Sequence, residues 1–369
     1  MTSHRVAGLI YGPQPHYLDH LGPLCSLLGI PLCVTEQSIF TLAQEFYPSL
    51  DLRLETYLSM GTYLIENFDI LFHCSVRQLF DDAFFFVQKL HNKKIHTIWC
   101  PHGNSDKGNI TYFMEALQEE RSALIYGEKM RDMLKTKGVL DKWHSYAITG
   151  NYRLSYYLKN QFFYKNLVTY KIERKLPANK KTILYAPTWD DFEKSSSLYD
   201  AYKYIINELP QEYNLIIKIH PNLYGQDPAK VERILGYCEG KDSILWLEDF
   251  PSIYPLLDFI DIYIGDASSI GYDFVTFNKP MVLLNQNNRI ADKDPGLYLY
   301  RCGIEIRRNQ YPDVYKILSA YLPTDGAHFE NIRKTTTEYT FGLPLTDNEL
   351  KEKIDTLYKT FPEQELNFY

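Results

Sequence analysis

The sequence lacks long apolar runs and blocks of basic residues. No window approaches the roughly eighteen uninterrupted apolar residues of a membrane-spanning helix, and the apolar run within residues 1–17 is too short for a secretory signal. The formal charge of −7 comes from 46 acidic and 39 basic residues. These features argue against nucleic acid and an anionic bilayer as partners. We therefore expect a cytoplasmic protein whose membrane contact is at most peripheral, at the inner face.

Cysteine motifs and glycine-rich phosphate loops are also missing. The six cysteines show no Cys-x-x-Cys spacing, which argues against a structural zinc site and a disulfide framework and suits a reducing compartment. Neither Gly-x-x-x-x-Gly-Lys-Ser nor Gly-x-Gly-x-x-Gly occurs, which counts against P-loop and dinucleotide sites. Without a Gly-x-Ser-x-Gly elbow, a hydrolase triad has no support.

The chain does contain an alternation of short apolar runs and amphipathic stretches. The runs lie at 5–11, 68–74, 95–100, 122–127 and 145–150, and then at 182–187, 213–220, 243–247, 261–265 and 280–285. Such runs are typical of buried parallel strands, and the stretches between them of helices on both sheet faces. The fold class predicted is α/β.

A chain of 369 residues is long enough for two domains. The alternation pauses at 166–181, which is polar and basic and indicates a linker. We predict an N-terminal domain over 1–170 and a C-terminal domain over 171–345, with a cleft between them. Thr346 and Glu349 form a capping box for a last helix within 346–369, which we expect to pack back toward the N-terminal domain.

Polar residues collect directly after the apolar runs. Because ligands of parallel sheets bind beyond the carboxyl ends of the strands, these positions are the candidate site. The segments concerned are "GPQPHYLDH", "PHGNSDKG", "PTWDD", "HPN" and "GDASS", which begin at residues 12, 101, 187, 220 and 265. Thr188 and Asp266 lie in two of them and are candidates for binding a donor phosphate.

The segment "YIGDASSIGYDF" at 263–274 leads from a strand into a helix. Gly265 allows a tight turn, Ser268 or Ser269 can cap the helix, and the free N–H groups of its first turn can bind an anion. The same residues also suit an ordinary turn and cap, so the segment alone leaves both interpretations open.

Two histidines follow predicted strands. His220 shares a strand face with Lys218, which suits an anion site or a general acid, although a histidine before a proline is also a common turn residue. His102 precedes Gly103 and lies five residues before Lys107. Such a loop can hold a general base near an acceptor hydroxyl, or it can be a plain polar loop.

His16, Asp19 and His20 fall on one side of an incipient helix. Their spacing invites a metal interpretation, but they are also good cap and dipole residues. We expect them to contact the acceptor near the cleft, and we expect neither a metal nor a cofactor.

Four segments occur in order: "PHGNSDK", "ILYAPTWDD", "IIKIHPN" and "IGDASSIGYDFVTFNKPMVLLN". Together, over about residues 95–290, they resemble the CDP-glycerol glycerophosphotransferase family, the teichoic-acid primases and polymerases. The resemblance implies a GT-B fold with two Rossmann-like domains. The nucleotide would bind the C-terminal domain, and the acceptor would approach from the N-terminal one.

The resemblance also implies roles for particular residues. His102 matches the histidine proposed as base in the family, with Gly103 and Lys107 on the acceptor side. His220 matches the histidine near the donor diphosphate.

Ser268 and Ser269 match the hydroxyl pair that holds phosphate, and Asp273 matches the acidic position that follows. Two departures stand out, since Asp190 and Lys218 occupy positions where the family usually has arginine.

These observations predict a transferase that moves a glycerol-phosphate-type group from a CDP-linked donor to a hydroxyl acceptor in cell-surface polymer synthesis. The acceptor would be lipid- or glycan-linked. One alternative is a GT-B glycosyltransferase or epimerase that acts on a nucleotide sugar. Another, from a different class, is a non-catalytic nucleotide-binding or scaffold protein.

Overall fold

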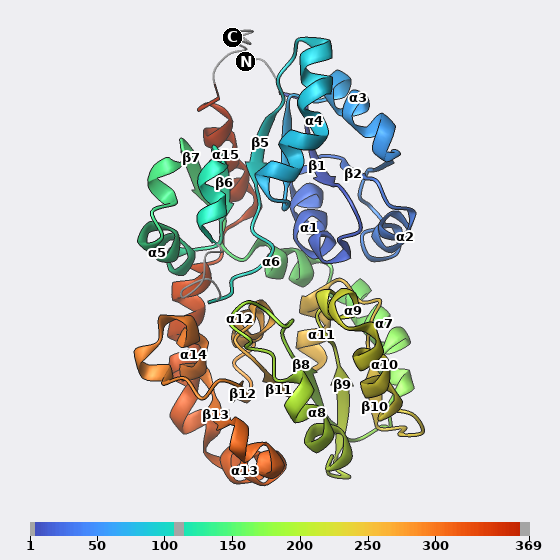
Figure 1. Ribbon diagram of the computed structural model, residues 1–369, viewed down its shortest axis with the longest axis vertical. Helices are drawn as coiled ribbons and strands as arrows, with labels where there is room; N and C mark the ends of the chain where they lie inside the picture. Colours follow the sequence, from blue (N-terminus) through green and yellow to red (C-terminus); the bar gives the residue numbers. More distant parts are fainter. Residues whose placement is uncertain (1–3, 107–113, 362–369) are drawn as a thin grey trace. The chain divides into compact units, whose positions relative to one another are not determined.

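The structure is a computed structural model that describes residues 4–106 and 114–361. The chain forms two compact units (Figure 1). The first comprises the described residues of Met1–His102, Met114–Lys159 and Thr340–Tyr369. The second comprises those of Gly103–Phe113 and Asn160–Tyr339.

The first unit is built on a seven-stranded parallel sheet with the order β3-β2-β1-β4-β5-β6-β7. Its strands are β1 Val6–Ile10, β2 Leu32–Val34, β3 Leu52–Leu54, β4 Ile70–His73, β5 His96–Trp99, β6 Ser122–Ile125 and β7 Ser145–Ile148. Its α-helices are α1 Leu18–Leu28, α2 Gln37–Phe46, α3 Tyr57–Asn67, α4 Arg77–His91, α5 Glu128–Thr136, α6 Tyr152–Lys159 and α15 Asp347–Tyr358. Short 3-10 helices are η1 Pro15–Tyr17, η2 Met114–Glu119 and η3 Leu140–Lys142.

The second unit is built on a six-stranded parallel sheet with the order β10-β9-β8-β11-β12-β13. Its strands are β8 Lys181–Ala186, β9 Tyr213–Ile217, β10 Ile244–Trp246, β11 Ile262–Gly265, β12 Met281–Asn285 and β13 Ile304–Arg307. Its α-helices are α7 Gln161–Lys171, α8 Leu198–Asn207, α9 Asn222–Gln226, α10 Pro228–Gly236, α11 Ile253–Phe259, α12 Ser269–Val275, α13 Val314–Tyr321 and α14 Asp325–Phe341. Its 3-10 helices are η4 Glu173–Lys175, η5 Ala291–Lys293, η6 Pro295–Cys302, η7 Arg308–Asp313 and η8 Leu322–Thr324.

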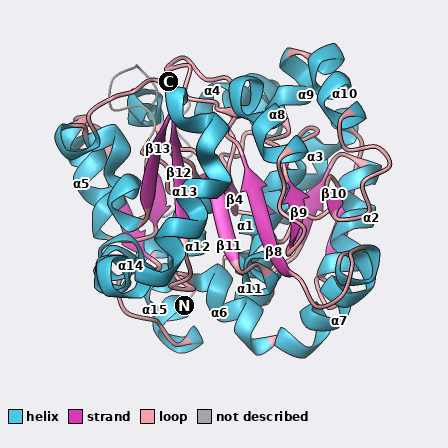
Figure 2. Cartoon of the chain, turned by 90° about the horizontal axis from the view of Figure 1, so that it is seen from below, coloured by secondary structure: helices cyan, strands magenta, loops and turns pink. Residues whose placement is uncertain are grey.

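Both sheets are covered by helices on their two faces, as Figure 2 shows for the row from β13 to β10. β9 and β12 are buried at every position and are mostly apolar, as strands covered on both faces are. The predicted α/β class with two parallel sheets is confirmed. Within residues 4–106 and 114–361, no helix is long and apolar enough to cross a membrane.

All ten predicted strands are present, and three further strands were missed. β2 and β3 have three residues each, too few for a period to show, and β3 is largely exposed. β13 has the sequence "IEIR", in which two charged residues interrupt the apolar run that the other predicted strands show. The capping box of Thr346 and Glu349 is confirmed at the start of α15.

The units divide at 159/160 and 339/340, whereas the sequence placed boundaries at 170/171 and 345/346. The polar stretch 166–181 contains the second half of α7, whose Tyr164 and Val168 are buried. α15 lies in the first unit, where it contacts β7.

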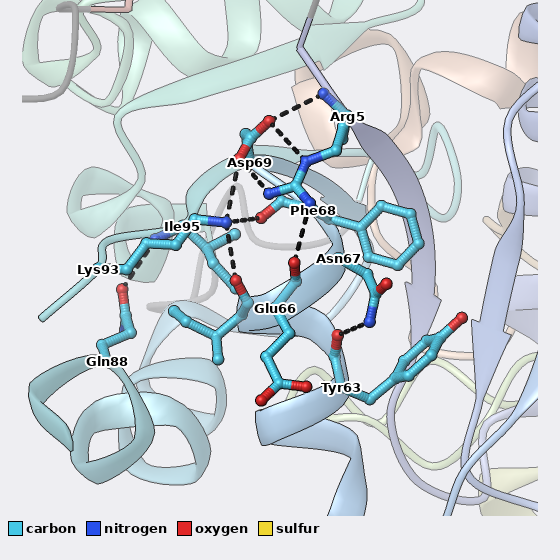
Figure 3. Close-up of polar contacts among 10 residues, drawn as sticks. Arg5, Tyr63, Glu66, Asn67, Phe68, Asp69, Gln88, Lys93 and Ile95 are labelled. Carbon is cyan, nitrogen blue, oxygen red and sulfur yellow. Dashed lines mark hydrogen bonds and ion pairs between the residues drawn. The ribbon is translucent and has the colours of Figure 1, made fainter. Parts of the chain in front are cut away.

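A polar cluster lies at the amino ends of β1, β4 and β5 in the first unit (Figure 3). Asp69 forms ion pairs with Arg5 at 3.1 Å and Lys93 at 3.0 Å. Lys93 Nζ also donates hydrogen bonds to the carbonyl oxygens of Ile65 and Phe68. We call Arg5, Asp69 and Lys93 the amino-end cluster. It joins the starts of neighbouring strands on the side opposite to that where ligands of parallel sheets bind.

Candidate active site

His102 follows β5 at the carboxyl end of the first sheet. Its ring centroid lies 5.9 Å from that of His16 and 5.2 Å from that of Tyr17. Desolvation by the surrounding protein lowers the pKa of His102 to about 4, against a hydrogen bond with the Cys74 backbone that raises it. The residue is nevertheless exposed, so a substrate can reach its ring. A neutral exposed imidazole can accept a proton at pH 7.

His20 lies in the first turn of α1 and is buried. Its Nδ1 is 2.6 Å from the hydroxyl of Tyr126, which follows β6. The same hydroxyl donates to the carbonyl oxygen of Pro101 at 3.1 Å. His20 is therefore linked through Tyr126 to the residue directly before His102.

Asp19 lies beside His20 on α1 and accepts a hydrogen bond from Arg153 Nη1 at 2.7 Å. The two side chains are 8% and 1% exposed, so this is a buried ion pair between α1 and α6. The structure thus gives Asp19 a structural partner. His16, by contrast, lies beside His102.

Gly103 and Ser269 approach closely within the second unit. A Cβ atom added at Gly103 would lie 2.1 Å from Ser269 Oγ and 2.8 Å from Ser269 Cβ. No side chain fits in this space, which explains why glycine follows His102. Two segments separated by more than 160 residues in the sequence therefore meet at the carboxyl end of β11.

Asp106 anchors the segment that contains Gly103, a role that sequence reasoning missed. Its buried carboxylate accepts hydrogen bonds from the Tyr272 hydroxyl at 2.7 and 2.6 Å and from the Leu299 N–H at 3.1 Å. In the sequence, an aspartate in a polar loop gives no sign of such distant partners. Lys107, the predicted acceptor-side lysine, lies outside the described residues.

Ser268 is the N-cap of α12, as the sequence indicated, but it makes no side-chain cap hydrogen bond. Its hydroxyl lies 3.1 Å from the Tyr263 hydroxyl because Tyr263 points back from β11 toward it. Ser269 is half-exposed. Asp273 is buried and accepts a hydrogen bond from Tyr254 on α11 at 2.8 Å, which ties the two helices together.

Asp266 follows β11 and is fully buried. Its Oδ2 accepts the backbone N–H groups of Thr188 at 2.9 Å and Ser197 at 3.1 Å. Thr188 is itself buried, and its carbonyl oxygen accepts the Ser196 hydroxyl at 2.7 Å. These two predicted phosphate ligands therefore shape the loop between β8 and α8.

His220 follows β9 and is half-exposed. Its Nδ1 accepts the backbone N–H of Asn222 at 3.2 Å, so in the neutral ring Nε2 carries the hydrogen and can donate it. Lys218, also half-exposed, lies two residues earlier, and Trp189 lies with its ring centroid 6.3 Å from that of His220. This is a donor-rich position beyond the strand.

The structure thus groups the predicted residues by unit. His16, His20 and His102 lie around one end of the first sheet, while Gly103 and Ser269 meet in the second unit. Over the described ranges, no group of three or more His, Cys, Asp or Glu could hold a metal ion. A depression of about 530 Å³ between α6 and α15 includes none of the predicted site residues. Because ligands of parallel sheets bind beyond the carboxyl ends of the strands, the polar residues at those ends remain the candidate site.

Similarity to solved structures defines the class of fold. The wall teichoic acid polymerase TagF superposes with a TM-score of 0.67 at 13% identity, over 96% of this chain and 88% of that one. A UDP-GlcNAc 2-epimerase from Neisseria meningitidis superposes with a TM-score of 0.57 at 12% identity, over 96% of this chain and all of that one. The predicted GT-B fold is confirmed.

Sequence comparison then gives a family match for part of the chain. Residues 156–300 match the family model of CDP-glycerol:poly(glycerophosphate) glycerophosphotransferase. The teichoic acid glycerol-phosphate primase of Bacillus spizizenii is 32% identical over 34% of this chain and 31% of its own length. The teichoic acid glycerol-phosphate primase of Bacillus subtilis is 24% identical over 69% of this chain and 66% of its own length. Residues 156–300 are thus similar to this glycerophosphotransferase family, and the chain spans less than two thirds of the length of either relative.

Proposed function

We propose that this protein transfers a glycerol-phosphate-type group from a CDP-linked donor to a hydroxyl acceptor in cell-surface polymer synthesis. The acceptor hydroxyl oxygen attacks the distal phosphorus of the donor diphosphate. A new P–O bond forms, the bond to CMP breaks, and the hydroxyl proton passes to the protein. The acceptor is a lipid- or glycan-linked alcohol, reached at the cytoplasmic face of the membrane.

On the acceptor side, His102 takes the hydroxyl proton. Its exposure and its lowered pKa keep an imidazole nitrogen available at neutral pH. His16 and Tyr17 flank this ring and bound the space that an acceptor can use.

On the donor side, His220 and Lys218 face the diphosphate. Nε2–H of His220 donates to a phosphate oxygen, and the Lys218 ammonium offsets the charge that develops on CMP as it leaves. The Ser269 hydroxyl supplies a further donor next to Gly103. Ser268 is mainly engaged with Tyr263, so we assign it to shaping the turn.

The observation that carries this proposal is the match of residues 156–300 to the family, because that stretch contains His220, Ser268 and Ser269. The close approach of Gly103 to Ser269 supports it, because it brings the segment after His102 to the second serine.

The test is CMP release from CDP-glycerol in the presence of an acceptor alcohol. His102→Ala and His220→Ala should each abolish turnover, and only His220→Ala should markedly weaken donor binding. His328→Ala is the matched control, because His328 is exposed on α14 and bonds only locally to the Thr324 carbonyl oxygen. Normal turnover in both site variants would refute the proposal.

A nucleotide-sugar enzyme is the second candidate, favoured by the similarity to the epimerase crystallised with UDP-GlcNAc. Thermal-shift measurements with CDP-glycerol, CDP-ribitol, UDP-GlcNAc and GDP-sugars separate the two, since a specific ligand raises Tm. Stabilisation by UDP-GlcNAc alone would favour the second candidate. No stabilisation by any nucleotide, together with intact cellular function after His102→Ala, would favour a scaffold.

A further inference from the structure

A buried hydrogen-bond chain ends on the carbonyl oxygen next to His102. It runs from His20 Nδ1 to the Tyr126 hydroxyl over 2.6 Å and from that hydroxyl to the Pro101 oxygen over 3.1 Å. His20 is 5% exposed and Tyr126 is fully buried, so water does not compete for these bonds. We call this the Tyr126 hydrogen-bond chain.

The protons in this chain have one consistent arrangement. Tyr126 has a single hydroxyl hydrogen, and the Pro101 oxygen can only accept, so that hydrogen points to Pro101. His20 must therefore donate from Nδ1. Burial lowers the pKa of His20 well below its ordinary value, and the nearby Arg153 charge lowers it further, so the ring is neutral with its hydrogen on Nδ1.

Arg153 also fixes the ring of Tyr126. Its guanidinium carbon lies 5.3 Å from the ring centroid, while its Nη1 is held by Asp19. The ring of Tyr152 stacks with that of Tyr126 at a centroid distance of 6.0 Å. The hydroxyl of Tyr126 is thus aimed by packing as well as by hydrogen bonds.

The carbonyl oxygen that accepts the last hydrogen bond belongs to Pro101, directly before His102. Proline fixes its own φ near −65°, so the remaining freedom before His102 is the ψ of Pro101. That angle sets the direction of the Pro101 carbonyl, which Tyr126 holds. The proline ring and this hydrogen bond together therefore restrict both backbone angles of Pro101, the residue directly before His102.

We propose that Tyr126 and His20 are positioning residues that aim the His102 imidazole by holding the Pro101 carbonyl. This inference rests on the proposed function in so far as His102 is the base, and it adds the residues that set its direction. Neither residue touches the substrate in this arrangement.

The experiment compares two tyrosine-to-phenylalanine variants of the full chain. Tyr126→Phe removes the hydroxyl that bonds to Pro101. Tyr152→Phe is the matched control, because Tyr152 is 2% exposed and its hydroxyl has no hydrogen-bond partner in the part of the chain that the structure describes. Tyr126→Phe should lower kcat about 10- to 100-fold with an unchanged KM for the donor, and Tyr152→Phe should leave kcat within about twofold.

A second pair of variants tests the first bond of the chain. His20→Asn keeps an N–H at the position of Nδ1 and should retain most of kcat, whereas His20→Leu should reproduce the loss seen in Tyr126→Phe. Rescue by asparagine separates a hydrogen-bond role from a general packing role.

A readout independent of turnover is the ring ¹³Cε1 resonance of His102, assigned through His102→Gln. The chemical shift of this resonance should change in Tyr126→Phe and remain unchanged in Tyr152→Phe. If the unaltered protein turns over CDP-glycerol but the two phenylalanine variants match in kcat and resonance, positioning is refuted and the proposed function stands. If the unaltered protein is inactive, the proposed function fails. The ¹³Cε1 resonance of His102 in the two variants still shows whether Tyr126 orients the His102 ring.

Discussion

At the amino ends of the first sheet, polar groups form partly exposed ion pairs, whereas at its carboxyl ends the Tyr126 hydrogen-bond chain and the Asp19–Arg153 ion pair are buried. The amino-end cluster pairs one carboxylate with two cations, and its Arg5 side chain is half exposed at 52%. The Tyr126 hydrogen-bond chain is buried and contains a neutral histidine. The charges of the amino-end cluster pair with one another. The Tyr126 hydrogen-bond chain instead ends on the carbonyl oxygen of Pro101, directly before the exposed His102.

This difference in burial predicts how much a substitution at each end of the sheet lowers the free energy of unfolding. Exposed ion pairs contribute little each and are screened by salt. Buried polar groups are costly to disturb, so they hold a geometry firmly. The comparison predicts that the same aspartate-to-asparagine change costs more at the buried carboxyl ends than at the partly exposed amino ends.

The largest effect is expected for Asp19→Asn. It leaves Arg153 buried without its carboxylate, so we expect a loss of about 3 kcal/mol in the free energy of unfolding. Urea unfolding checks it. Asp69→Asn is the control at the amino ends, and an equal loss in both variants would contradict the comparison.

Gly103→Ala should lose about 2 kcal/mol through overpacking against Ser269. Adding Ser269→Gly should restore only part of that stability, because it removes both atoms that the new Cβ would meet but leaves alanine at a φ of +158°. Gly225→Ala on α9, where nothing lies within 4 Å of an added Cβ, serves as the control and should be neutral or slightly stabilising. Equal behaviour of the two alanine variants would show that the space at Gly103 is open.

The pH dependence of stability should distinguish the two ends. The folded pKa of His20 is depressed below its unfolded value near 6.5, so its stabilising contribution is complete above that pH and is lost as the pH falls. Below pH 6, His20→Asn should reduce the slope of unfolding free energy against pH by about 1.4 kcal/mol per unit, the value for one proton. An unchanged slope would mean that His20 is already protonated in the folded protein.

The smallest effect is expected for Asp69→Asn, about 1 kcal/mol once solvent screening of this partly exposed group is allowed for. Burial raises the pKa of Asp69, but hydrogen bonds from Arg5 and Lys93 outweigh it and lower the pKa to about 2. The stabilisation should thus be present above about pH 4 and disappear as the pH falls toward 2. Acid titration of unfolding in low and high salt measures it, and a loss that survives at pH 2 would point to packing instead.

Local patterns in the sequence were enough to predict most of the strands, the fold class and the resemblance to the glycerophosphotransferase family. Runs such as 213–220 can be recognised because a strand buried on both faces consists mostly of apolar residues. Three-residue strands such as β2 carry too little pattern, and β13 is interrupted by charge. Position after a strand also selected His102, His220 and Ser269.

Long-range partners could not be predicted in the same way. Nothing near Asp106 in the sequence indicates Tyr272, and nothing near His20 indicates Tyr126. Asp19, Asp266 and Asp273 were selected by type and position, but type does not reveal whether a carboxylate faces a ligand or a buried donor. Only the fold decides which neutral or charged partner each one meets.

The first unit is completed by residues 340–361, with Leu350, Ile354 and Leu357 buried in α15 and Phe341 packed against Tyr126. The ribosome must therefore synthesise residues 160–339, which form most of the second unit, before the first can close its core. At ordinary elongation rates this interval lasts roughly ten to forty seconds. During this interval the nascent first unit exposes the apolar surface that α15 later covers.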